Sequence, residues 1–194
     1  MKIQLDSAIF HKFYFLTIIL LLFFPPTIFS QSLPFKDYKE ASIYKGDFNG
    51  DKQLDKIVVY EKKCDSLDDS FLEDATCRRI AIFLKIKGNF KLYGYNDNLI
   101  DCSQCGGAGV GDPFQNITIK KQYFSVESLY GACDKTFIVT TFKFDITSNE
   151  FYLYKIGTED YSCNDVENSN GEIISRIETK TQKDFGKIKF INYK

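Results

Sequence analysis

Apolar and polar residues alternate with period two through most of the chain after residue 45, and this pattern predicts β-strands. The clearest case is residues 78–87 (RRIAIFLKIK), where every second side chain is apolar. Alternate residues of a strand lie on one face. We therefore expect the four aliphatic residues on one face of this segment to point toward a core: Ile80, Ile82, Leu84 and Ile86. Residues 116–120 show the same pattern at Ile117 and Ile119.

Short polar segments between these runs predict antiparallel hairpins. Gly88–Asn89 has the composition of a two-residue hairpin turn, and Lys121–Gln122 and residues 147–150 separate later runs. About eight strands are expected, rich in the residues that favour β-structure. The candidate segments are 56–60, 78–87, 90–95, 116–120, 123–129, 137–145, 151–156, 172–179 and 187–191. Residues 35–44 are too short to classify, and a helix or irregular packing are both open there.

These strands predict an all-β fold, an antiparallel meander that forms a sandwich or an open barrel. No internal repeat and no Pro- or Ser-rich linker divides residues 31–194. We therefore expect a single all-β domain over 31–194.

The N-terminus predicts export. Lys2 and Lys12 precede an apolar run at 13–24, and Pro25–Pro26 follows it. This order is typical of a secretory signal peptide, which we place at residues 1–30. The uninterrupted run is shorter than the roughly 20 residues of a membrane-spanning helix. We therefore expect no membrane span after cleavage and a periplasmic or extracellular location.

Six cysteines in an exported chain indicate disulfides. We prefer the pairing Cys64–Cys77, Cys102–Cys105 and Cys133–Cys163, with the first pair the best supported. Cys102 and Cys105 could instead form a redox dithiol or half of a zinc site. The first alternative needs a βαβ context and the second needs another close cysteine pair, and the sequence offers neither.

Charge and composition exclude several functions. The formal net charge is −1, which gives no electrostatic reason to expect binding to nucleic acid or to an anionic membrane. The single histidine is His11, inside the expected signal peptide. Catalysis by a Ser-His-Asp or Cys-His arrangement is therefore excluded for residues 31–194.

Alternating acidic residues upstream of the strand at 56–60 predict a calcium site. Calcium binds six to eight oxygen ligands, and a tightly turning loop can point several oxygens at one centre. The expected ligands are Asp47, Asn49, Asp51, Gln53 through its backbone carbonyl, and Asp55. The loop is not an EF-hand, because Lys52 and Val58 stand where that motif has glycine and glutamate. The alternative is a turn closed by Asp and Asn hydrogen bonds without an ion.

Residues 46–55 (GDFNGDKQLD), followed by an apolar strand, resemble the FG-GAP and VCBS class of repeats. In that class a GDxNGDGxxD loop leads into a strand, which implies calcium binding by the acidic residues and blades of a β-propeller. Here Lys52 replaces a glycine, and the chain has one such loop where a propeller needs several blades. We therefore apply the resemblance to the loop and not to the fold.

A second resemblance covers most of residues 31–194. It rests on GDFNGD, Arg78–Arg79, Gly106–Gly107, residues 111–114 (GDPF) and the FxF run at 142–144. Together these are similar to a family of uncharacterised secreted bacterial proteins. The resemblance implies an exported single domain and no particular activity.

The favoured hypothesis is a non-enzymatic, exported, calcium-binding β domain that serves as a binding or structural module for a protein or glycan. Tyr152 and Tyr154 share a strand face and could form a ligand platform, although packing is the simpler role. One alternative is a hydrolase of polysaccharide or peptidoglycan that uses two carboxylates, with Asp97, Asp101 and Asp112 as candidates. The other is a secreted enzyme inhibitor that uses the acidic residues between Cys64 and Cys77.

Overall fold

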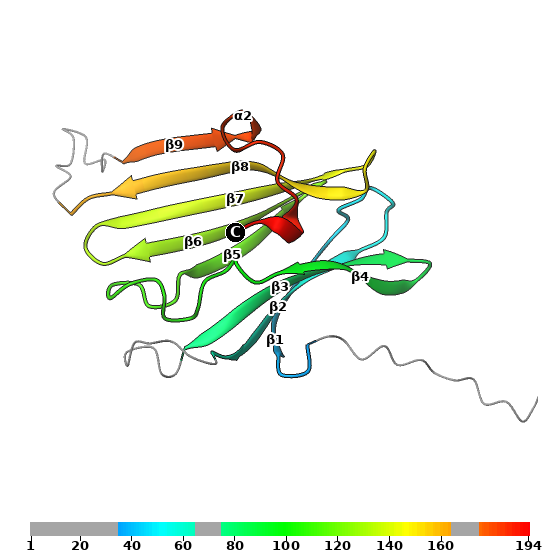
Figure 1. Ribbon diagram of the computed structural model, residues 1–194, viewed down its shortest axis with the longest axis horizontal. Coiled ribbons are helices and arrows are strands. Elements are labelled where there is room, and N and C mark those ends of the chain that lie inside the picture. Colours follow the sequence, from blue (N-terminus) through cyan, green and yellow to red (C-terminus); the bar gives the residue numbers. More distant parts are fainter. Residues whose placement is uncertain (1–34, 65–74, 164–174) are drawn as a thin grey trace, which may run out of the picture. The chain divides into compact units, whose positions relative to one another are not determined.

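The chain folds into two antiparallel β-sheets (Figure 1). A computed structural model of the protein describes residues 35–64, 75–163 and 175–194. The expected signal peptide and the acidic residues at 65–74 lie outside them. Residues Asp37–Lys194 form one compact unit. No helix in the described part of the chain is long and apolar enough to span a membrane.

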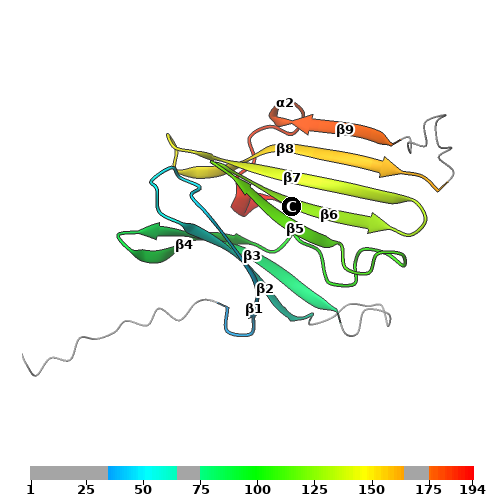
Figure 2. The same ribbon diagram turned by 180° about the vertical axis from the view of Figure 1, so that it is seen from behind.

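Each sheet is a meander in which strands follow one another in chain order (Figures 1 and 2). The first sheet contains β1 (Lys39–Gly46), β2 (Asp55–Lys63), β3 (Thr76–Ile86) and β4 (Asn89–Asn96). The second contains β5 (Phe114–Lys120), β6 (Tyr123–Gly131), β7 (Lys135–Asp145), β8 (Glu150–Tyr161) and β9 (Arg176–Thr181). A short helix α2 (Gln182–Phe185) and a 3₁₀ turn η2 (Phe190–Asn192) follow. The predicted all-β antiparallel meander is confirmed.

The two sheets share one hydrophobic core, so the sandwich is the alternative that the protein adopts. The first sheet contributes aliphatic side chains such as Ile57, Ile80 and Ile82. The second contributes mainly aromatic ones: Phe124, Phe142, Phe144 and Phe151. The predicted inward face of 78–87 is confirmed for Ile80, Ile82 and Leu84, whereas Ile86 is exposed where β3 ends.

The hairpin turns confirm the predicted connections, with one shift in register. Ile86 pairs with Asn89, so the turn between β3 and β4 is Lys87–Gly88, one residue earlier than predicted. Both turn residues have positive φ, at 50° and 84°, as a type I′ turn requires. Lys121–Gln122 forms the predicted two-residue turn between β5 and β6.

Two predictions about chain segments need correction. The unclassified N-terminal segment is a strand from Lys39, because β1 pairs along β2. The prediction of a strand at 187–191 is wrong, because within this segment only Lys189 forms a β-bridge, and its partner is Tyr152. Phe190 is instead fully buried, and its ring meets those of Phe124 and Phe142 edge-on. Burial of this ring outweighs the β-propensity of the segment.

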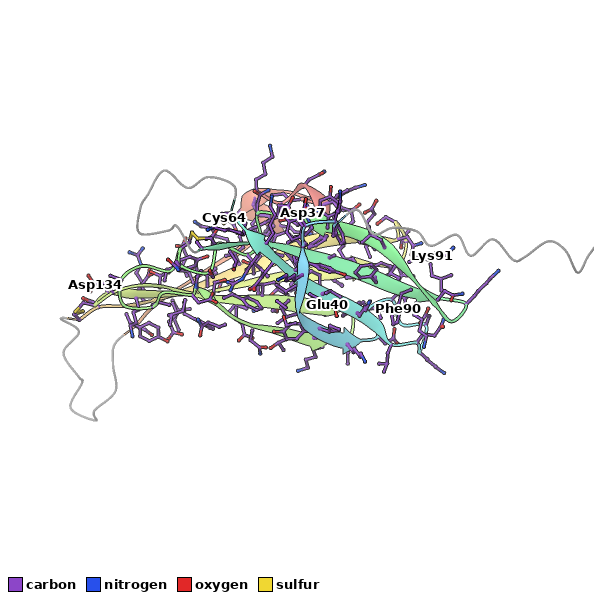
Figure 3. All side chains as sticks on the ribbon, turned by 90° about the horizontal axis from the view of Figure 1, so that it is seen from below. Asp37, Glu40, Cys64, Phe90, Lys91 and Asp134 are labelled. Atoms are coloured by element: carbon purple, nitrogen blue, oxygen red, sulfur yellow. A yellow bond between two sulfur atoms is a disulfide. The ribbon has the colours of Figure 1, made fainter. Side chains whose placement is uncertain are left out.

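All six cysteines are paired as predicted. The bonds are Cys64–Cys77, Cys102–Cys105 and Cys133–Cys163, with Cα atoms 5.0, 5.1 and 5.4 Å apart, within the usual range for disulfides. Cys64 lies toward the opposite end of the first sheet from Phe90 and Lys91 (Figure 3). The Cys133–Cys163 bond joins the β6–β7 connection to the residues after β8.

Candidate functional site

The predicted calcium loop connects β1 to β2 and is closed by its own hydrogen bonds. Asp47 begins it, with one carboxylate oxygen accepting from the Gly50 amide at 2.7 Å and the other from the Lys52 amide at 2.9 Å. Lys52 has a φ of 66°, a conformation that costs least for glycine.

Three of the predicted ligands meet at Asp51. Its Oδ2 accepts from Asn49 Nδ2 at 3.1 Å and from Gln53 Nε2 at 3.3 Å. Its Oδ1 accepts from the Gln53 amide at 2.8 Å, and Asn49 Oδ1 accepts from the Asp51 amide at 3.0 Å. These side chains are at least partly accessible to solvent.

Asp55, the fifth predicted ligand, is fully buried. Its oxygens accept from the Phe48 amide at 3.0 Å and from the Lys85 amide at 2.8 Å. Burial raises the pKa of Asp55, these two bonds oppose the rise, and the charges of Asp51 and Asp47 add to it. Asp55 therefore connects the loop to β3, because it accepts one hydrogen bond from Phe48 in the loop and one from Lys85 on β3.

The loop thus has the form of a turn closed by Asp and Asn hydrogen bonds. Within the described residues, no three His, Cys, Asp or Glu side chains form a group that could hold a metal ion. The two oxygens of Asp47 and Oδ1 of Asp51 each accept one hydrogen bond and keep a lone pair of the kind that calcium prefers, whereas Asp51 Oδ2 accepts two. Calcium binding here stays a prediction.

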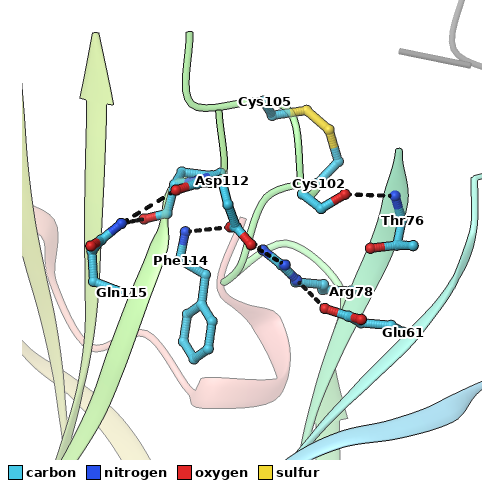
Figure 4. A network of polar contacts seen from close by, with 10 residues as sticks. Glu61, Thr76, Arg78, Cys102, Cys105, Asp112, Phe114 and Gln115 are labelled. Carbon is cyan, nitrogen blue, oxygen red and sulfur yellow. Dashed lines mark hydrogen bonds and ion pairs between the residues drawn. A yellow bond between two sulfur atoms is a disulfide. The ribbon is translucent and has the colours of Figure 1, made fainter. Parts of the chain in front are cut away.

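The carboxylates proposed for a hydrolase are held in separate contacts. Arg78 lies between Asp112 and Glu61 (Figure 4), with its terminal nitrogens 2.6 and 2.5 Å from the Asp112 oxygens and its Nε 2.8 Å from Glu61. Burial of Asp112 acts to raise its pKa, but the hydrogen bonds from Arg78 and Phe114 and the Arg78 charge lower it overall. A general acid needs the opposite shift, so Asp112 does not fit that role.

The other two candidate carboxylates also support the fold. Asp97 receives two hydrogen bonds from Arg79, at 2.6 and 2.8 Å. Asp101 accepts the Tyr130 hydroxyl at 2.8 Å. Burial, together with this bond, raises the pKa of Tyr130 to about 12. Each of these three carboxylates is thus held by a different side chain.

Aromatic and lysine side chains gather on the outer face of the second sheet. Tyr152 and Tyr154 alternate with buried Phe151 and Leu153, so the two tyrosines lie on the face opposite the core, as the sequence predicts. Tyr154 is 43% exposed, whereas Tyr152 is buried. The Tyr154 ring meets that of Tyr123 edge-on at 5.1 Å.

Two lysines approach these rings from different elements. Lys143 on β7 places its Nζ 5.4 Å from the centre of the Tyr123 ring. Lys187, after α2, places its Nζ 4.1 Å from the centre of the Tyr152 ring. Each position gives a cation–π contact.

The two lysines, together with Tyr152 and Tyr154, line a surface hollow of about 430 Å³. Gln122 lines it from the β5–β6 turn and Gln182 from α2. Gln182 also donates to the Leu153 carbonyl at 2.9 Å, beside the register shift where Phe142 pairs with Leu153 and Thr141 with Lys155. The hollow combines an exposed ring, two amides and two cations. Sequence reasoning found only its tyrosines, because the other side chains come from distant segments.

Comparison with known proteins gives no match at any level. No protein-family model matches the chain, no curated protein matches it, and no solved structure matches it. The likeness of the acidic loop to FG-GAP and VCBS repeats therefore stays a prediction that rests on its residues alone.

Proposed function

We propose that this protein is an exported, non-enzymatic binding module that recognises a glycan on the outer face of its second sheet. The observation that carries the proposal is the exposed Tyr154 ring within the hollow. An aromatic ring offers a flat apolar surface for a sugar ring, and a few placed polar groups around it fix orientation. Gln122 and Gln182 are suited to hydrogen bonds with hydroxyl groups.

Two features support export in this proposal. All six cysteines form disulfides, which form and persist mainly in oxidising compartments. The N-terminal segment has the sequence of a secretory signal. A periplasmic or extracellular location follows.

Replacing Tyr154 with alanine is expected to weaken glycan binding about tenfold, because a well-placed ring contributes roughly 1 to 1.5 kcal/mol. The measurement is binding of the purified, disulfide-bonded protein to a panel of immobilised neutral and acidic oligosaccharides, followed by titration calorimetry on the best ligand. Phe90→Ala is the matched control, since Phe90 is an exposed ring on the first sheet. Absence of any glycan ligand, or equal binding by Tyr154→Ala and the parent, would overturn the proposal.

We also propose that the loop from Asp47 to Asp55 binds calcium weakly and that the ion rigidifies this end of the domain. Asp47, Asn49, Asp51, Gln53 and Asp55 would hold it. Their oxygens suit a hard cation, and a dissociation constant on the order of 0.1 to 1 mM is usual for extracellular modules.

Calcium at a few-fold excess over its dissociation constant is expected to stabilise the protein by about 1 kcal/mol and to raise the melting temperature by about 3 °C. Asp51→Ala should abolish the rise, because three predicted ligands meet at Asp51. Glu178→Gln, an exposed carboxylate on β9, should keep it. Melting temperatures that are equal in calcium and in chelator would remove the calcium proposal and leave the glycan proposal untouched.

A further inference from the structure

A second hollow adjoins the first where the C-terminal segment runs beside β8. It measures about 590 Å³ and is lined by residues after α2, including Lys189, Asn192 and Lys194. Tyr152 and Lys187 line both hollows. The two hollows therefore adjoin, and we name them together the outer groove, with the Tyr152–Lys187 contact between its halves.

The outer groove is rich in lysine. Four lysines line it, from β7 and from the chain after α2: Lys143, Lys187, Lys189 and Lys194. Asp145 is the one carboxylate among the described lining residues. The whole chain has a formal charge of −1, so this concentration of cations is a local property of the groove.

Part of this positive charge is balanced by neighbouring carboxylates. Lys189 Nζ lies 2.8 Å from Glu150 Oε1, and Lys187 Nζ lies 3.8 Å from Asp145 Oδ2. A backbone hydrogen bond from Thr147, with further bonds in the turn, lowers the pKa of Asp145, so Asp145 is ionised at neutral pH. Two side-chain carboxylates against four lysine side chains leave a surplus of positive side-chain charge along the groove.

The remaining polar groups are suited to a sugar chain. Gln122 and Gln182 line the first hollow and Asn192 the second. Their amides can each donate to and accept from hydroxyl groups. Lysines are compact point charges, and the planar guanidinium that pairs with phosphate in two hydrogen bonds is absent from the described lining residues. Point charges beside amides and an exposed ring suit carboxylates spaced along a sugar chain.

We propose that the outer groove binds an anionic oligosaccharide of uronate type, with one sugar ring on Tyr154 and carboxylates near Lys143 and Lys187. This inference rests on the proposed glycan-binding function and specifies its ligand class. Binding in both hollows at once requires an oligomer of several sugar residues, because the hollows lie on either side of Tyr152.

The test uses the full secreted chain with its disulfides intact and a galacturonate hexamer as the probe. The matched neutral probe is the same hexamer with its carboxyl groups reduced to alcohols. Titration calorimetry is expected to give an affinity at least tenfold higher for the uronate at about 50 mM salt, with most of this preference lost at about 500 mM salt. Lys143→Gln and Lys187→Gln should each weaken uronate binding about fivefold.

Lys91→Gln is the control, because Lys91 is exposed on the first sheet (Figure 3), and it should bind like the parent. Thermal melts establish that each variant folds. Equal binding of both hexamers would overturn the uronate proposal and leave the glycan function standing. Binding of neither hexamer, nor of any other glycan, would overturn both. Tighter binding of a thymidine hexanucleotide than of the uronate would also overturn the uronate proposal.

Discussion

Phe48→Ala is expected to lower the free energy of unfolding by about 4 kcal/mol, the usual cost of removing a large buried aromatic side chain. Phe48 belongs to the acidic loop, yet its side chain is fully buried. Its ring centre lies 6.0 Å from that of Phe151 and 6.5 Å from that of Phe124, both on the second sheet. The substitution therefore leaves a cavity where the loop meets the core.

Urea unfolding followed by circular dichroism measures this loss. Leu54→Ala is the matched control, because Leu54 lies in the same loop and is 57% exposed. Its substitution should change stability by no more than about 0.5 kcal/mol. A loss below about 1 kcal/mol for Phe48→Ala would contradict the packing of the loop against the second sheet.

Asp112→Ala is expected to destabilise the fold by about 3 kcal/mol at neutral pH, because it removes one partner of a buried charge. The Arg78 side chain is 5% exposed, and without Asp112 the one carboxylate paired with it among the described residues is Glu61. This loss of stability lies at the low end of the usual range for breaking a buried ion pair, because Asp112 itself is 45% exposed. Glu178→Ala, in an exposed pair with Lys180 at 3.6 Å, should cost less than about 1 kcal/mol.

The pH dependence of this effect distinguishes lost charge pairing from lost packing. The pKa of Asp112 is lowered in the folded protein from an ordinary value of 3.8. Its stabilising contribution is therefore complete above that value and is lost as pH falls through the lower, folded pKa. The difference in unfolding free energy between the parent and Asp112→Ala should shrink from pH 7 toward pH 2. A difference that stays constant over this range would contradict the charge-pair explanation.

Much of the fold could be predicted from local pattern, because period-two alternation and polar turns belong to individual hairpins. The strands around Ile80 and Ile117 were predictable for that reason. The C-terminal turn was not, because Phe190 fits the alternation of a strand as well as it fits a buried 3₁₀ turn. Its conformation depends on space between the sheets and on Asn96, which donates to the Phe190 and Tyr193 carbonyls at 2.8 Å each.

In the candidate sites too, local spacing predicts some features, while others depend on residues far apart in the sequence. The spacing of Asp47, Asn49 and Asp51 predicts a tight polar loop, and in the structure the Asn49 amide donates to Asp51. The burial of Asp55 depends on the Lys85 amide, 30 residues further along the chain, so local spacing could not predict it. The outer groove could not be predicted from the sequence either, because strand register and the path of the chain after α2 bring Lys143 and Lys187 to the same surface.

The meander topology has a consequence for folding kinetics. In the part of the chain that the structure describes, each strand pairs only with its neighbours in sequence. Pairings of low sequence separation carry a small loop-closure entropy, and proteins dominated by them fold faster than other β-proteins of similar size. Each sheet can therefore assemble by successive hairpin closure, and docking of the two sheets then becomes the late, long-range step.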